Sequence, residues 1–219
     1  MKVAYMLKTV NEDMTAYHDF KWPKRGKVEA PDWDPEPICG GGLHGLLDGE
    51  GDGTLLNWSS KAKWLVVKID QDEAIEIAGK VKVPRGSVVH CGNQVSATQY
   101  LQKRGLTGAI VGAMVVRGDR GTATAGYSGT ATAGYSGTAT AGYSGIATAG
   151  DSGTATAGYS GIATAGYSGI ATAGGGGTIS LKWWDGRRSR IEVFYVGEEG
   201  IRLNTPYRCI DGKAVEVEE

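Results

Sequence analysis

An eight-residue unit repeats seven times in this chain without a slip in register, and this repeat constrains the fold more than any other feature. The unit is Gly-Thr-Ala-Thr-Ala-Gly-Tyr-Ser, and its copies begin at Gly121, Gly129, Gly137, Gly145, Gly153, Gly161 and Gly169. Imperfect copies occupy residues 113–120 and 177–181, and Asp151 is the one charged residue between positions 121 and 177. A fixed period with atypical end copies is typical of a solenoid with capping repeats.

The composition of one octad predicts a strand followed by a turn. Thr-Ala-Thr-Ala alternates a β-branched residue with a small one, which suits a short strand with two different faces. Gly-Tyr-Ser-Gly is typical of a turn, in which we expect the glycines to adopt positive φ. Two octads would make a 16-residue coil. Three octads in a 24-residue coil remain the alternative, because the period fits both.

The copy that leaves the array indicates which strand face is buried. Ile179 and Leu181 stand at the alanine positions of that copy, so we expect the alanines to point inward and the threonines outward. In a 16-residue coil, the more regular outer face then carries one set of threonine pairs: Thr122, Thr124, Thr138, Thr140, Thr154 and Thr156. The same coil stacks Tyr127, Tyr143 and Tyr159 at one turn as a ladder, with neighbours about 4.8 Å apart.

The flanking segments predict two further domains. Residues 1–105 are typical of an α+β head, with strands at 2–10, 62–69 and 86–91 and helices at 42–47 and 94–103, the second helix having Asn93 as N-cap and Gly105 just beyond its end. In the tail, Asp185-Gly186 and Asp211-Gly212 each indicate a hairpin. The predicted fold is mostly β, with a thin β-solenoid of two octads per coil (106–181) between the α+β head (1–105) and a β-hairpin cap (182–219).

Charge and cysteine content exclude several classes of protein. The net charge of −1 over 219 residues gives no reason to expect nucleic acid or an anionic membrane as partner. No apolar run approaches the roughly 18–20 residues that span a bilayer, and the first eight residues are typical of a strand rather than a signal peptide. Three cysteines are too few for a disulfide scaffold, so we expect a cytoplasmic protein without a cofactor.

The octads resemble the repeats of bacterial ice-nucleation proteins, which also join Ala-Gly-Tyr turns to Thr-x-Thr strands in 16-residue coils. The resemblance covers residues 113–181, and it implies association along the tyrosine ladder. The whole chain also resembles small uncharacterised bacterial and prophage proteins. These place a Cys-Gly-x-Gly-Leu-His segment, here Cys39 to His44, before the octads and a Trp-Trp-Asp-Gly hairpin, here Trp183 to Gly186, after them. That second resemblance implies a shared architecture and no activity.

Four residues of the head have side chains that zinc accepts as ligands, namely Cys39, His44, His90 and Cys91. Their spacing lacks the Cys-x2–4-Cys pairs of structural sites, and adjacent residues on a strand point to opposite faces. Small buried cysteines and hydrogen-bonded histidines are therefore the favoured interpretation. His44 or His90 with a carboxylate such as Glu50 or Asp52 is a candidate for acid–base chemistry, with His44 singled out as the catalytic candidate. An enzyme is less favoured than a binding protein.

The loop from Gly40 to Gly42 could in principle bind an anion through its backbone N–H groups. It lacks a lysine, serine or threonine at the spacing of a phosphate-binding loop. We therefore interpret it as a tight turn.

Three hypotheses for function follow from these patterns. The first is a structural or binding protein, in which the rigid solenoid is a rod for self-association, as a dimer, or for docking another protein. The second is binding of ice or ordered water by the threonine face, because its lattice of methyl and hydroxyl groups resembles the one that ice-binding proteins of several folds use. The third is an enzyme or metal site in the head near His44.

Overall fold

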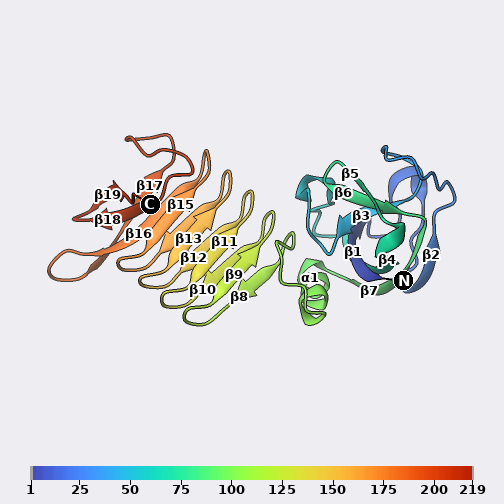
Figure 1. Cartoon of the computed structure of the whole chain (residues 1–219), viewed down its shortest axis with the longest axis horizontal. Coiled ribbons are helices and arrows are strands. Elements are labelled where there is room, and N and C mark those ends of the chain that lie inside the picture. Colours follow the sequence, from blue (N-terminus) through green and yellow to red (C-terminus); the bar gives the residue numbers. More distant parts are fainter. Residues whose placement is uncertain (1, 219) are drawn as a thin grey trace. The chain divides into compact units, whose positions relative to one another are not determined.

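The computed structural model describes residues 2–218. They form two compact units, an N-terminal unit that ends at Val111 and a C-terminal unit that begins at Gly112 (Figure 1). The chain is mostly β, with one α-helix, α1 (Gln94–Lys103), among the described residues and a β-solenoid in the C-terminal unit. This confirms the predicted fold class. No helix within residues 2–218 has the length and apolar character needed to cross a membrane.

The N-terminal unit contains one sheet of seven strands in the order β2-β7-β4-β1-β3-β6-β5, and all neighbours are antiparallel. The strands are β1 (Val3–Val10), β2 (Gly26–Glu29), β3 (Leu43–Leu47), β4 (Lys63–Asp70), β5 (Ile75–Ile77), β6 (Lys80–Val83) and β7 (Arg85–Gly92). Short 3-10 helices lie at η1 (Tyr17–Asp19), η2 (Gly53–Leu55) and η3 (Gln71–Glu73). The strands predicted at 2–10, 62–69 and 86–91 correspond to β1, β4 and β7 and are confirmed.

Both faces of this sheet are buried. On one face, Met6 of β1 joins an apolar cluster that includes Trp22 and Leu65. On the other face, Leu7 lies close to Leu101 of α1 and to Ile110, because all three approach the same side of Gly49. A sheet covered on both sides explains the continuous buried runs Met6–Leu7 of β1 and Trp64–Val67 of β4, and it makes the half-buried Lys8 on β1 unusual.

The helix α1 has the ends that the sequence predicted. The Asn93 side chain accepts a hydrogen bond from the Ser96 amide at 2.9 Å, and the Ser96 hydroxyl accepts one from the Asn93 amide at 3.1 Å. Gly105 follows the C-cap with φ of +86°. A reciprocal capping box at the start and a left-handed glycine at the end satisfy the free backbone groups of both helix termini.

The helix predicted at residues 42–47 is wrong, because this segment forms β3. Leu43 pairs with Val83 of β6, and Leu46 pairs with Leu7 of β1. Gly45 lets β3 approach β1 closely, since a Cβ there would lie 2.6 Å from the Leu7 carbonyl oxygen. These pairings with distant strands determine the structure of the segment, because six residues are too few for a local pattern to define a helix.

The C-terminal unit is a solenoid of two parallel sheets, in which successive octads contribute their strands alternately to one sheet and to the other (Figure 1, yellow-green to orange). One sheet, named here the even sheet, contains β8 (Met114–Val116), β10 (Thr130–Ala133), β12 (Ile146–Ala149), β14 (Ile162–Ala165), β16 (Thr178–Trp184) and β17 (Ser189–Tyr195). The other, the odd sheet, contains β9 (Thr122–Ala125), β11 (Thr138–Ala141), β13 (Thr154–Ala157), β15 (Ile170–Ala173), β18 (Tyr207–Ile210) and β19 (Lys213–Glu216).

Strand pairing fixes the coil at 16 residues and excludes the 24-residue alternative. Thr122 pairs with Thr138, and Thr138 pairs with Thr154. Alanines fill the space between the two sheets: every alanine at the strand positions of the octads is at most 3 % exposed, whereas the threonines are half-buried or exposed. A larger inward residue would overpack this narrow interior, at a cost of about 1–3 kcal/mol.

The expectation that the turn glycines adopt positive φ is wrong, because the serines do so instead. Ser128, Ser144 and Ser160 have φ between 49° and 52°. The glycines are needed for a different reason, the close approach of successive coils. A Cβ on Gly142 would lie 2.8 Å from the carbonyl carbon of Gly126 in the preceding coil. The turn backbone is therefore stacked too tightly for any side chain at that position.

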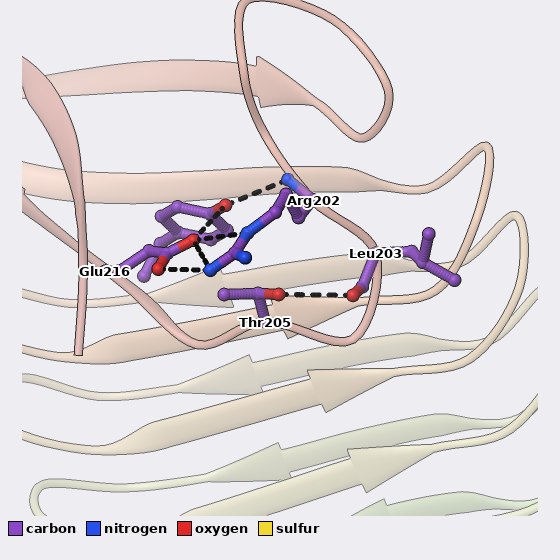
Figure 2. Close-up of polar contacts among 5 residues, drawn as sticks. Arg202, Leu203, Thr205 and Glu216 are labelled. Carbon is purple, nitrogen blue, oxygen red and sulfur yellow. Dashed lines mark hydrogen bonds and ion pairs between the residues drawn. The ribbon is translucent and has the colours of Figure 1, made fainter. Parts of the chain in front are cut away.

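Antiparallel strands end the solenoid, as the two predicted hairpins required. β17 pairs with β16, and β18 pairs with β19 and meets β15 at Ala171. Polar contacts fix the loop that precedes β18 (Figure 2). The Arg202 guanidinium forms an ion pair and hydrogen bonds with Glu216, and the Arg202 amide donates to the Tyr207 hydroxyl at 2.8 Å. The Tyr207 hydroxyl also donates to the Glu216 carboxylate at 3.2 Å.

Candidate functional site

The odd sheet presents a uniform outer face of threonines. Two columns run across its strands in register, one through the first strand position of each octad and one through the third: Thr122, Thr138 and Thr154, then Thr124, Thr140, Thr156 and Thr172. Neighbours in a column are about 4.8 Å apart and the two columns about 6.8 Å apart. Ile170 ends the first column. The structure thus brings together all six threonines singled out in the sequence.

The even sheet presents a more mixed outer face, because apolar residues interrupt the threonines of its first column. Met114 and Val116 are each 63 % exposed, and Ile146 and Ile162 lie in the same column as Met114. β17 continues this face, because Tyr195 pairs with the outward Thr178. The second column of the even sheet keeps Thr132, Thr148 and Thr164 in register. The two faces therefore differ in their first columns, where the odd sheet repeats threonine in three successive coils and the even sheet does not.

Three tyrosine rings stack at one turn of the solenoid. Tyr127 and Tyr143 have ring centroids 5.2 Å apart with an interplanar angle of 3°, and Tyr143 and Tyr159 are 5.4 Å apart at 16°. Tyr143 and Tyr159 are about half exposed. Gly175 takes the next position, so the row ends at Tyr159. The row therefore presents an aromatic surface in which all three tyrosine rings have nearly the same orientation.

The four predicted zinc candidates do not lie together. His44 is on β3, whereas His90 and Cys91 are on β7, and β1 and β4 lie between these strands in the sheet. His90 hydrogen bonds the Ser96 hydroxyl at 3.0 Å, and Cys39 is exposed and accepts from the Lys80 ammonium at 3.3 Å. Nowhere in residues 2–218 do three or more histidine, cysteine or acidic side chains come close enough to share a metal ion.

His44 has an unusual environment for a neutral base. Its Nε2 atom is buried and has no hydrogen-bond partner. Burial, and after it the positive charges of Lys80, Lys8 and Lys82, lower the pKa of His44 to about 4, although a hydrogen bond with the Gly42 backbone acts in the opposite direction. A hydrogen bond that raises the pKa of histidine is one that the imidazole ring donates. Because Nε2 has no partner, the donor to the Gly42 backbone is Nδ1, and Nε2 of the neutral ring is left as an acceptor.

His44 lines a pocket of about 290 Å³ in the N-terminal unit, together with Lys8, Trp22 and the loop from Gly40 to Gly42. Sequence reasoning singled out His44 and the loop but missed Lys8. The sequence did contain a signal for Lys8. Alternate residues of a strand share one face, so Lys8 lies on the same face of β1 as the core residues Met6 and Val10. A lysine at a core position of a strand is a candidate functional residue.

Known proteins are similar to separate parts of the chain. Residues 4–103 match a family described as "Domain of unknown function (DUF7666)". "Ice nucleation protein InaU" of Pantoea ananas is 37% identical over 98 residues, which are 44% of this chain and 10% of that protein. An "Ice nucleation protein" of Pseudomonas syringae is 33% identical over 103 residues, 46% of this chain and 9% of that protein.

An "Ice nucleation protein" of Xanthomonas campestris pv. translucens is 35% identical over 97 residues, covering 43% of this chain and 6% of that protein. The repeats therefore resemble those of ice-nucleation proteins, and the chain spans a tenth or less of the length of these relatives. No solved structure matches the chain significantly.

Proposed function

We propose that the solenoid is a rigid rod whose odd-sheet threonine face binds ice or ordered water. The observation that carries the proposal is the register of that face, in which threonine repeats across three successive coils in both columns. The similarity to ice-nucleation proteins supports the same assignment.

Rigidity is what makes such a face effective. Threonine is β-branched, so its χ1 angle has few states to lose on binding. The central strands β11 and β13 are held by parallel ladders on both sides and by alanines packed behind them. The methyl and hydroxyl groups are therefore already in position, and little conformational entropy is lost when they meet an ordered surface.

The opposite sheet supplies a matched control for this proposal. Thr138 lies in the centre of the first odd-sheet column, and Thr130 occupies the same octad position on the even sheet, between Met114 and Ile146. We expect the purified protein to show thermal hysteresis or shaped ice crystals. Thr138→Lys should abolish most of that effect and Thr130→Lys should preserve it. Absence of any effect in the wild type, or equal losses in the two variants, would refute the proposal.

A second candidate function is self-association or protein docking through the stacked tyrosines. Half-exposed rings held parallel offer wide contact area at low entropic cost. We expect a dimer by light scattering, and a monomer when Tyr127, Tyr143 and Tyr159 are all changed to serine. Tyr135 and Tyr167 lie at the opposite turn and are equally exposed, so their double change to serine is the control. A wild-type monomer, or an unchanged dimer in the triple variant, would exclude self-association through this row.

A further inference from the structure

The pocket of the N-terminal unit has features that the solenoid function does not use. Strands β1 and β3 line it beside the loop from Gly40 to Gly42, and Phe20 and Trp22 form an aromatic wall. The two rings meet edge to face, with centroids 5.7 Å apart. A concave, aromatic-lined space with a few polar groups is typical of a small-molecule site.

Lys8 supplies a cation without a counter-ion in this pocket. Its ammonium lies 5.8 Å from the centroid of the Trp22 ring. No ion pair among residues 2–218 involves Lys8. Burial lowers the pKa of Lys8 to about 8, and the charge of Lys80 acts in the same direction. An anion beside Lys8 would relieve this unfavourable desolvation.

Lys82 and Asp32 hold the loop of the pocket in place. Lys82 is fully buried, and its ammonium donates to the carbonyl oxygens of Ile38 at 3.1 Å and Gly40 at 3.2 Å. The Asp32 carboxylate accepts from the Gly42 amide at 3.1 Å. The carboxylate that lines the pocket is therefore engaged by the loop, while Lys8, Lys80 and Lys82 leave the surroundings of His44 positively charged.

We infer that this pocket binds a small aromatic anion that also carries a hydrogen-bond donor. The anionic oxygens accept from the Lys8 ammonium, and the planar ring packs against Trp22 and Phe20. The donor, such as a hydroxyl, satisfies the buried Nε2 atom of His44. The anion and the donor thus meet the two groups of the pocket, the Lys8 ammonium and the His44 Nε2 atom, that lack an ion-pair or hydrogen-bond partner.

Calorimetry with simple probes tests the inference on the full chain. We expect 4-hydroxybenzoate to bind saturably at pH 7, benzoate to bind more weakly because it lacks the donor, and inorganic phosphate to bind more weakly still because it lacks the ring. Lys8→Met keeps the length of the side chain and removes its charge, and should weaken both aromatic probes at least tenfold. Lys61→Met, an exposed lysine of the same unit, should leave binding unchanged.

A second variant separates the role of His44 from that of Lys8. His44→Phe should remove the preference for 4-hydroxybenzoate over benzoate, because phenylalanine cannot accept a hydrogen bond from the hydroxyl. Thermal unfolding of each variant verifies that it is folded, and Lys8→Met should be at least as stable as the wild type. The inference is overturned if none of the probes binds, if Lys8→Met binds them as the wild type does, or if phosphate binds as tightly as the aromatic anions.

Discussion

The carboxylate of Asp151 accepts a hydrogen bond from the backbone amide of Tyr167, with 2.8 Å between Oδ1 and N. Asp119 makes the same bond to the amide of Tyr135, at 2.9 Å. Each pair is 16 residues apart, so each bond joins two successive coils at the same turn. The two aspartates therefore replace tyrosine in the octad at sites where a side chain links one coil to the next.

Removing this link is expected to destabilise the C-terminal unit. Asp151→Ala should lower the free energy of unfolding by about 1 kcal/mol, the typical net contribution of one intramolecular hydrogen bond. Asp151→Asn keeps an acceptor and should lose less. The nearby Lys182 ammonium is 3.7 Å away and exposed, so its contribution is about 0–1 kcal/mol. Urea unfolding at low and high salt measures both effects, and an alanine variant as stable as the wild type would contradict the prediction.

The turn glycines are expected to be intolerant of a methyl group. Gly142→Ala places a Cβ 2.8 Å from the Gly126 carbonyl carbon and 2.9 Å from the Tyr127 nitrogen. Both are backbone atoms, so the coils must separate, at a cost of about 1–3 kcal/mol or more. Gly118→Ala is the matched control, because no atom lies within 4 Å and φ is not positive there. Thermal unfolding should show a loss for Gly142→Ala only, and equal losses would refute this explanation of the glycines.

The turn serines are expected to be sensitive to branching at Cβ. Ser144 has φ of 51°, a left-handed conformation that costs roughly 1–2 kcal/mol for an ordinary residue. Ser144→Val should therefore destabilise the unit, whereas Ser144→Gly should be neutral or stabilising. Gly176, at the equivalent position of the last octad, has φ of 64°. Urea unfolding measures the difference, with Thr140→Val on the adjacent strand as a control for the added valine.

Acid is expected to destabilise the N-terminal unit through His44. The pKa of His44 is about 4 in the folded protein, below its ordinary value of 6.5. The unfolded chain therefore binds more protons between these values, and stability falls as the pH drops from 6.5 to 4. His44→Phe should flatten this part of the curve of unfolding free energy against pH. His90, whose pKa burial also lowers, should give a smaller change when replaced by Phe. A His44→Phe curve parallel to the wild type would disprove the role of His44.

The solenoid could be predicted from sequence because each octad encodes its own structure. The alternation of threonine and alanine predicts the strand and its buried face, and Ile179 and Leu181 orient that face. Asn93 and Gly105 define the ends of α1 by equally local rules. Where a few neighbouring residues determine the outcome, the prediction is confirmed.

Features that depend on distant parts of the chain could not be predicted. β3 is a strand because β1 and β6 pair with it on either side. The requirement for Gly142 arises from the coil before it rather than from its own φ. The environment of His44 depends on lysines from β1 and β6, which no spacing in the sequence brings near it.

The alternation of successive octads between the two sheets sets a rule for how such an array can change in length. Deleting a single octad would move every later octad to the other sheet, so the threonine columns and the tyrosine row would be interrupted at the deletion. Deleting or inserting 16 residues would keep each column continuous and leave the terminal strands paired as before. Although the sequence repeats every eight residues, the unit in which the gene can grow or shrink without altering either face is therefore the coil of two octads.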